Sequence, residues 1–155
     1  MILSLYGAAN ADASARVLSF CEMTATSDTT RPGTVIVLAE LGKGAHSSYL
    51  WSKGCEVASV NGAAWENQVW LADSSYSPGT IGGSVDFTSD RASFEAAWAA
   101  LRKVKSDRVA ILLEGVFRLP KGVTVLKDGT RIGVGDQGLY YSVFVAKRIL
   151  AVLPL

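Results

Sequence analysis

The sequence predicts a mainly β fold with one or two helices, most simply a small five-stranded barrel. Three observations support this prediction. Residues 108–117 form a long apolar run rich in branched side chains, which is typical of a strand. Residues 133–138 are punctuated by glycines and lead into a second strand-forming run, residues 139–152. Between the two halves of the chain, residues 90–104 repeat their apolar side chains at helical spacing.

The helix predicted over residues 90–104 has a start signal and an apolar face. Ser89 or Asp90 can cap its free N–H groups. Its apolar face comprises Phe94, Ala97, Trp98 and Leu101. We expect this face to pack on the barrel. A shorter helix is expected over residues 15–23.

Several strands are expected before this helix. Residues 34–41 alternate but are apolar on both faces, which indicates a strand covered on both sides. Glycines at 42 and 44 predict a hairpin turn to a partner strand at residues 47–51. We also expect an irregular segment over 54–62, a strand over 68–72 and a loop over 73–83. After the helix and the strand over 108–117, we expect a hairpin arm over 121–130.

The order of these elements fits one known barrel arrangement. Five strands with a helix between the third and the fourth strand describe the OB fold, a partly open barrel. We therefore expect an OB-like barrel.

Length, composition and charge limit the number of domains and the kinds of partner that we expect. With 155 residues, 49% of them hydrophobic, the chain can bury a core, and we expect residues 14–155 to form one domain. The net charge of +1 argues against a general polyanion binder. Residues 1–100 carry five basic and ten acidic side chains, whereas residues 101–155 carry ten and four. This bias indicates either a basic face toward an anionic partner or charges that interleave on one surface.

The N-terminus indicates export. Residues 1–9 are apolar, and residues 9–13 contain two patterns of small residues suited to a leader peptidase. Residues 1–13 are thus a candidate truncated signal-peptide remnant; the alternative is an alanine-rich terminus. No run is long enough for a transmembrane helix.

The two cysteines agree with export. Cys21 and Cys55 could pair in an oxidising compartment such as the periplasm, or remain two unrelated buried thiols, and we expect the disulfide. Two distant cysteines and one histidine offer neither a zinc site nor a redox CxxC motif. We expect no metal and no cofactor.

Two sequence features suggest a nucleotide-binding or catalytic site, but their surroundings do not support that function. Residues 133–138 match GxGxxG, but the following residues form a strand instead of the helix that a dinucleotide site requires, so we interpret the motif as a turn. His46 has no grouped carboxylates or triad acid near it in the sequence, and we do not expect it to be catalytic.

Two glutamates interrupt apolar strands. Glu40 and Glu114 could approach each other across a barrel and act as a carboxylate pair in hydrolysis. The alternative is that each faces solvent or pairs with Arg108, Arg118 or Arg148, and we favour this alternative.

A binding surface is the last candidate. Basic and aromatic side chains follow one another late in the chain, as in OB folds that stack bases in a basic groove. The candidate surface comprises Arg118, Lys121, Arg131 and Tyr140, with Tyr76 as a further binding lip. Export and the low net charge argue against nucleic acid as the partner.

Four stretches, residues 18–22, 33–41, 49–55 and 133–149, carry a further signal and include both cysteines. In these stretches the chain resembles a group of uncharacterised bacterial exported proteins with a small OB-like barrel. Where that group has a histidine in the last turn, this chain has Gln137. The resemblance implies no activity. We expect a non-enzymatic binding or structural module of the bacterial envelope, with an envelope protein or a small ligand as partner. The alternative is a module for single-stranded nucleic acid or another polyanion.

Overall fold

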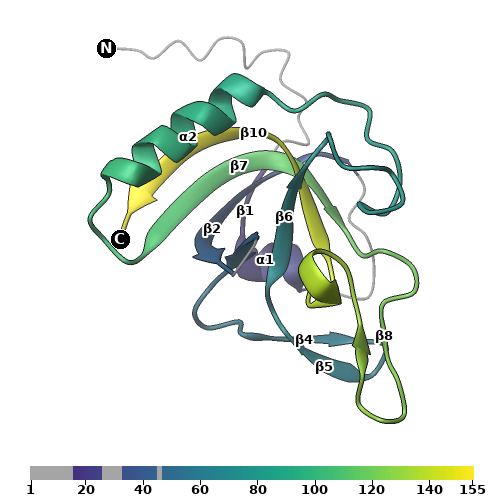
Figure 1. The fold of residues 1–155 in the computed structure, drawn as a ribbon. Helices are drawn as coiled ribbons and strands as arrows, with labels where there is room; N and C mark the ends of the chain where they lie inside the picture. Colours follow the sequence, from purple (N-terminus) through teal and green to yellow (C-terminus); the bar gives the residue numbers. More distant parts are fainter. Residues whose placement is uncertain (1–15, 26–32, 45–46) are drawn as a thin grey trace.

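The computed structural model describes residues 16–25, 33–44 and 47–155. Within these residues the fold is mainly β, with two α-helices and one short 3-10 helix (Figure 1). The expected signal-peptide remnant at residues 1–13 lies outside the described residues. The elements, in chain order, are β1 (Val17–Ser19), α1 (Phe20–Thr24), β2 (Val35–Lys43), β3 (Ser48–Trp51), β4 (Val57–Val60), β5 (Ala63–Glu66), β6 (Val69–Asp73), α2 (Arg91–Lys103), β7 (Val109–Arg118), β8 (Thr124–Val125), β9 (Arg131–Ile132), the 3-10 helix (Asp136–Gly138) and β10 (Val143–Pro154).

Five strands close into a mixed barrel. Around the ring they follow the order β2, β3, β6, β10, β7 and back to β2. The β6–β10 pair is parallel, with Val143 beside Trp70, and the other four pairs are antiparallel. The ring closes where β2 pairs with β7, from Val35 beside Gly115 to Glu40 beside Ala110. The prediction of a barrel is confirmed, but the ring is closed where we expected it to be partly open.

The position of the helix in the strand sequence differs from the prediction. When all strands of the chain are counted, helix α2 lies between the sixth and the seventh, β6 and β7, and not between strands three and four. The difference arises because β1 precedes the barrel and the β4–β5 hairpin is inserted before β6, so the count of strands is higher than the sequence indicated. Asp90 is the N-cap of α2, as predicted, and its carboxylate accepts a hydrogen bond from the N–H of Ser93 at 3.3 Å.

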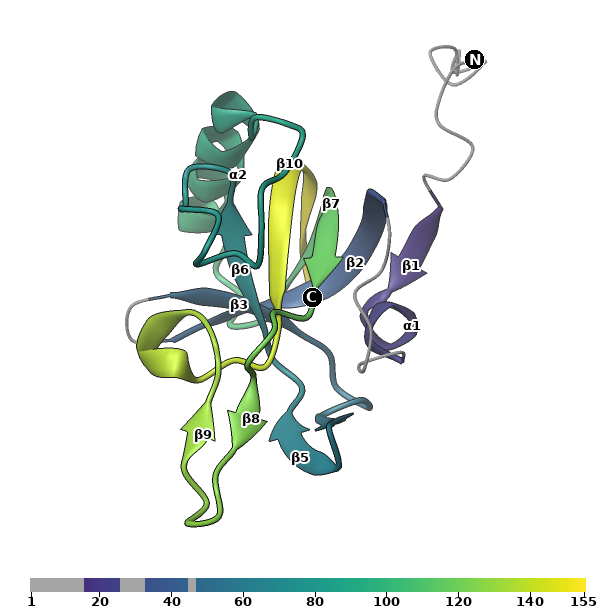
Figure 2. The same cartoon turned by 90° about the vertical axis from the view of Figure 1, so that its right-hand side faces the viewer.

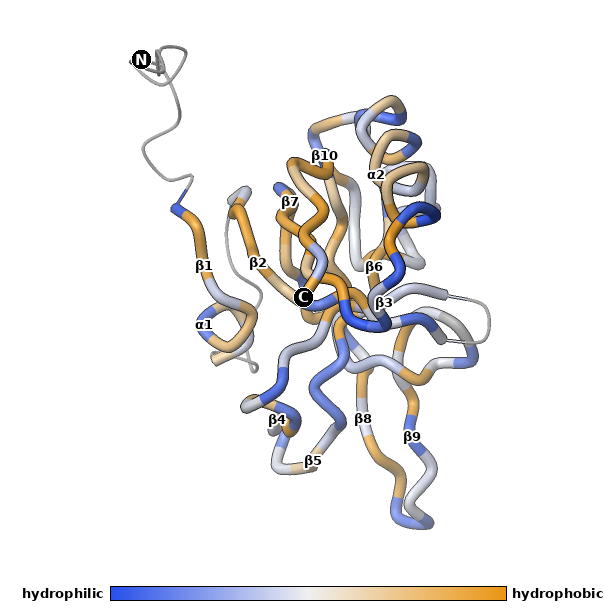
Figure 3. The backbone as a smooth tube through the Cα atoms, turned by 90° about the vertical axis from the view of Figure 1, so that its left-hand side faces the viewer, coloured by the Kyte–Doolittle hydropathy of each residue, from blue (hydrophilic) through white to orange (hydrophobic). Residues whose placement is uncertain are grey.

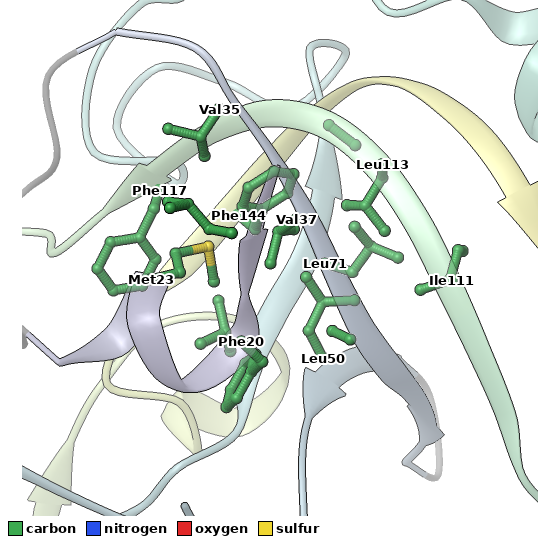
Figure 4. Close-up of a cluster of buried hydrophobic side chains, with 14 of the residues drawn as sticks. Phe20, Met23, Val35, Val37, Leu50, Leu71, Ile111, Leu113, Phe117 and Phe144 are labelled. Atoms are coloured by element: carbon green, nitrogen blue, oxygen red, sulfur yellow. The ribbon is translucent and has the colours of Figure 1, made fainter. Parts of the chain in front are cut away.

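The alternation of the strands fills the barrel interior. Along β2, Val35, Val37 and Ala39 are buried, and β7 contributes Ile111, Leu113 and Phe117. Because successive side chains of a strand point to opposite faces, these residues share the inner face. Figure 4 shows them meeting residues of β3, β6 and β10 in one cluster.

Helix α1 adds to this core from outside the ring. Phe20 and Met23 are buried and belong to the same apolar cluster as Phe117 and Val37 (Figure 4). The helix was predicted over residues 15–23, but it begins at Phe20, because Val17–Ser19 pairs with β2 as the parallel strand β1. Ser19 caps the helix: its Oγ accepts a hydrogen bond from the N–H of Glu22 at 3.0 Å.

A disulfide and a buried hydrogen-bond chain hold α1 in place. Cys21 is bonded to Cys55, which confirms the predicted pair. Tyr141 donates to Asn67 Oδ1 at 2.6 Å, and Asn67 Nδ2 donates to Thr24 Oγ1 at 2.9 Å. Burial raises the pKa of Tyr141, so its hydroxyl keeps the proton that it donates. Helix α1 is therefore joined to the segments before β6 and before β10.

Two small hairpins extend from one end of the barrel (Figure 2). Strand β4 lies within residues 54–62, which we expected to be irregular, and β5 follows directly after them. Their turn is Asn61-Gly62, and both residues have positive φ (51° and 80°), as a type I′ hairpin turn requires. Strands β8 and β9 form the second hairpin, which lies within and just beyond the arm predicted over residues 121–130.

The GxGxxG stretch is a turn, as predicted. Val134 and Tyr140 exchange backbone hydrogen bonds of 2.7 and 3.1 Å across it, and the chain continues into β10. Gly135 has a φ of +72°, and a Cβ there would lie 2.8 Å from Trp70 Cγ. A glycine is needed at this position because the turn packs directly on the indole.

Hydrophobic residues are concentrated in the barrel strands, and hydrophilic residues are more frequent in the loops (Figure 3). The most hydrophobic segments include strands β2, β7 and β10. Among the described residues, no helix has both the length and the apolar character to cross a membrane.

The disulfide predicts a measurable stability contribution. The two cysteines are 34 residues apart in sequence, and the bond between them reduces the conformational entropy of the unfolded chain. We expect the double variant Cys21→Ser, Cys55→Ser to lose about 2–4 kcal/mol of the free energy of unfolding. Urea unfolding of the two proteins measures this difference. The single variant Cys55→Ser serves as control and should lose a similar amount; an unchanged midpoint in both variants would contradict the prediction.

Candidate functional site

A loop of residues 74–89 leaves β6 and returns to α2 (Figure 1). Its two ends are clasped by reciprocal hydrogen bonds: the N–H of Ser74 donates to Ser89 Oγ at 2.9 Å, and the N–H of Ser89 donates to Ser74 Oγ at 2.7 Å. Ser89 Oγ also donates to the carbonyl of Ala146 in β10 at 2.6 Å. The clasp gives the segment the form of a compact Ω-loop fixed to the barrel.

The middle of this loop is fixed by Arg118 and by Ile81. The Arg118 guanidinium donates to the carbonyls of Gly83 and Ser84, each at 2.6 Å. Ile81 is only 1% exposed. It belongs to a second apolar cluster with Trp70, Ala72, Tyr140, Val143 and Val145. Since Phe144 and Ala146 of β10 face the interior, Val143 and Val145, which alternate with them, face outward, and the loop covers this outer face of the barrel.

A groove lies between the loop, α2 and the β2–β3 turn; we call it the α2 groove. It consists of three neighbouring hollows of about 670, 400 and 280 Å³. Trp98 lines all three, while Tyr76, Phe94 and Asp73 line the first two. The size of the largest hollow is within the range of small-molecule sites.

Aromatic rings form the walls of the groove. Tyr76 is 44% exposed and stands edge-on to Trp70, with ring centroids 4.9 Å apart. On α2, Phe94 and Trp98 are one helical turn apart, and their centroids are 6.4 Å apart. Both pack partly against the core, as predicted for this helix face, but neither is fully buried. Their remaining surface lines the hollows.

Polar side chains alternate with these rings. Hydroxyl groups line the largest hollow: Ser74, Ser75, Ser84, Thr88 and Ser89. Asp73, Glu95 and Arg91 add charge there. Asp73 is partly engaged, because its carboxylate accepts hydrogen bonds from the N–H of Ser75 at 2.7 Å and from the Ser75 hydroxyl.

The smallest hollow is basic. Lys43 and Arg102 line it together with Trp98, and both cations are exposed. Within the described part of the chain, neither forms an ion pair. The groove therefore runs from a hydroxyl-rich end with two carboxylates to an end with two cations.

The predicted surface residues do not form one patch. Tyr76 lies in the α2 groove. Tyr140 is 4% exposed, lies 5.9 Å from the Tyr49 ring and has its hydroxyl 3.0 Å from Ser47 Oγ. Arg118 holds the loop. Lys121 is exposed in the turn after β7.

Arg131 belongs to the far hairpin. Its guanidinium donates to the carbonyl of Ala64 at 2.6 Å and lies 4.9 Å from the centre of the Trp65 ring. It therefore tethers β9 to β5. The sequence did not single out Phe94 or Trp98 as site residues, because their helical spacing also fits simple core packing.

The two glutamates each have their own arginine. Glu40 accepts a hydrogen bond from Arg108 Nε at 2.9 Å, and Glu114 accepts one from Arg148 Nε at 2.5 Å. The Arg108 hydrogen bond lowers the pKa of Glu40, against the effect of burial. Both carboxylates are on the outer face and four residues apart along the β2–β7 ladder, which corresponds to about 13 Å. This geometry fits the favoured expectation of arginine pairing.

Among the residues that the structure describes, no three His, Cys, Asp or Glu side chains are grouped closely enough to hold a metal ion. His46 lies outside the described residues, so its expected lack of a catalytic role stays a prediction.

Comparisons with protein-family models, with curated proteins and with solved structures found no significant match.

The contacts of Arg118 predict the behaviour of the loop. Replacing it with glutamine removes the two short hydrogen bonds to the loop carbonyls. We expect amide hydrogen exchange of residues 74–89 to accelerate by about tenfold, while the barrel strands stay protected. Mass-resolved exchange measures this. Lys121→Gln removes a neighbouring exposed cation and should leave the loop unchanged; equal exchange rates in Arg118→Gln and the wild type would contradict the role of Arg118.

The Glu40–Arg108 pair predicts a pH dependence. Because the folded-state pKa of Glu40 is below its ordinary value of 4.5, the pair stabilises the fold above that pH, and the stabilisation is lost as the pH falls through the lowered pKa. We expect Glu40→Gln to show a smaller drop in the free energy of unfolding than the wild type between about pH 5 and pH 3. Urea unfolding across this range measures it. Parallel pH profiles for the two proteins would disprove the assignment.

Proposed function

We propose that this protein is a non-enzymatic binding module of the bacterial envelope that takes its ligand in the α2 groove. The observation that carries the proposal is a preformed aromatic groove whose wall, the loop of residues 74–89, is fixed at its ends and in its middle. A fixed wall lowers the ordering cost of binding. Partly exposed aromatic rings next to hydroxyl groups and charges provide both contact area and specificity.

The arrangement of the barrel supports an OB-like assignment. Its five strands follow one another around the ring as first, second, third, fifth and fourth in chain order, and the third and fifth are parallel. Helix α2 leads from β6 to β7, and Gly44 and Ser47, between β2 and β3, line the second hollow. OB folds bind ligands on the face of their second and third strands and on the adjoining loops. The α2 groove adjoins that face here, since Ser48 of β3 and Trp70 of β6 line it.

The disulfide supports an envelope location. Disulfides persist in oxidising compartments, and small exported domains commonly use them. The Cys21–Cys55 bond joins α1 to the segment before β4 and thus belongs to the architecture of the domain.

The alternatives find less support in the geometry. A nucleic-acid surface needs free cations and exposed rings, but Arg118 is engaged with loop carbonyls and Tyr140 is buried. A carboxylate-pair hydrolase needs two carboxyl groups at one reacting bond, whereas Glu40 and Glu114 are each paired with an arginine and about 13 Å apart along the ladder.

The proposal is tested by binding. We expect fragments from a chemically mixed library, including sugars, amino acids and aromatic acids, to shift amide resonances of α2 and of residues 74–89 in heteronuclear NMR spectra. Tyr76→Ala should weaken the best fragment about tenfold, because it removes an exposed ring without disturbing the core.

The matched control is Leu139→Ala, which truncates another exposed side chain, outside the groove. It should leave affinity unchanged. If fragments bind to the β8–β9 hairpin and not to the groove, the proposed site is wrong. If the protein converts any library member into a product, the proposed non-enzymatic function is wrong.

A further inference from the structure

We propose that the ligand of the α2 groove is an oligosaccharide that carries a carboxylate. Its sugar rings would lie against Tyr76 and Trp98, and its carboxylate would lie between Lys43 and Arg102. This inference rests on the proposed function and adds the chemical class of the ligand.

The shape and lining of the groove fit sugar rings. Phe94, Trp98 and Arg102 succeed one another on one side of α2, and the distance from the first to the last is about 12 Å along the helix axis. An elongated ligand of several rings can follow this line. Sugars present apolar ring faces and many hydroxyl groups, and the groove offers aromatic rings together with Ser75, Thr88 and the carboxylate of Glu95 as hydrogen-bond partners.

Closure of the barrel argues against an extended peptide that adds a strand. Strand β3 is paired with β2 and β6, and β6 is paired with β3 and β10. Strand β3 covers β6 only at Val69 and Trp70, so among the described strands the one edge left open at the groove is that of Leu71–Asp73. Peptide recognition by strand addition depends on a free edge, and an edge of three residues is shorter than a usual strand.

The charges argue against a polyphosphate or a purely apolar ligand. The largest hollow is lined by two carboxylates, Asp73 and Glu95, against one cation, Arg91, so its charges disfavour a chain of phosphates. The hydroxyls of Ser84 and Thr88 also line this hollow, and an apolar chain would cover them without offering hydrogen bonds.

The basic end sets the charge of the ligand. Lys43 comes from the end of β2 and Arg102 from the last turn of α2, so two separate elements bring cations to the smallest hollow. Both are exposed, and within the described residues neither has an ion-pair partner. Two donors of this kind suit one carboxylate, which can accept from both at once.

The experiment uses matched pairs of oligosaccharides. Each pair comprises a neutral trisaccharide and the same trisaccharide bearing one uronate, built on xylotriose, cellotriose and N-acetylated chitotriose. We expect at least one uronate to bind about tenfold more tightly than its neutral counterpart, measured by calorimetry and by resonance shifts of the Trp98 indole. The double variant Lys43→Gln, Arg102→Gln should lose this preference and keep the affinity for the neutral trisaccharide.

Lys127→Gln is the control for net charge, because Lys127 is exposed in the β8–β9 hairpin. It should retain the preference. Trp98→Phe keeps a ring and should retain part of the affinity, whereas Trp98→Ala should abolish binding of both members; thermal unfolding verifies that each variant folds.

The outcomes separate this inference from the proposed function. If no saccharide binds, or if the members of every pair bind equally, the acidic-saccharide assignment is wrong. A proline-rich peptide that shifts the Trp98 indole while the saccharides do not would also overturn it, yet would leave the groove as the binding site. If neither the fragment library nor the saccharides affect the groove, both proposals fail.

Discussion

The pairing of β2 with β7 is the constraint on which the rest of the structure depends. It joins residues 35–40 to residues 110–115 and turns a five-stranded sheet into a ring. At the end of this ladder Gly115 allows β10 to approach closely, since a Cβ there would come within 2.9 Å of the Ala146 Cα. A ring this small is filled by its own side chains. Function must therefore reside on its outside or on its connections.

Closure also explains why the segment between β6 and β7 is long. The outward side chains Trp70 and Ala72 of β6, and Val143 and Val145 of β10, are apolar and would otherwise be exposed to water. Loop 74–89 covers them, and the burial of Ile81 alone is worth about 1.5–3 kcal/mol. Helix α2 completes the cover only in part. Many of its residues are alanines, and Ala97 is its one buried residue. The rings of Phe94 and Trp98 are therefore only partly covered, and their exposed surface faces the loop across the α2 groove.

Features of the fold that depend on neighbouring residues were predictable, and those that depend on distant partners were not. The Asp90 cap, the β2–β3 hairpin and the final turn all follow from local patterns. The Cys21–Cys55 pair is the exception: its members are distant in sequence, but two cysteines allow only one pair. The Asn61-Gly62 hairpin had a local signal that was overlooked. From the sequence, Arg118 was assigned to a binding surface. Its actual partners could not be predicted, because the carbonyls that it binds precede it by about 35 residues. For the same reason only Tyr76 of the predicted surface lies in the groove.

Stability and binding use different parts of this molecule. Helix α1, the disulfide and the Tyr141–Asn67–Thr24 chain stabilise one side of the barrel, whereas α2 and the loop lie on another side (Figures 2 and 3). The groove residues Tyr76, Lys43 and Arg102 are exposed and take no part in the core. Side chains at these positions can change with little effect on folding, because surface substitutions away from caps, cores and buried networks cost little. A closed barrel with an incomplete outer cover can thus keep its fold while the chemistry of the groove is adapted to a ligand.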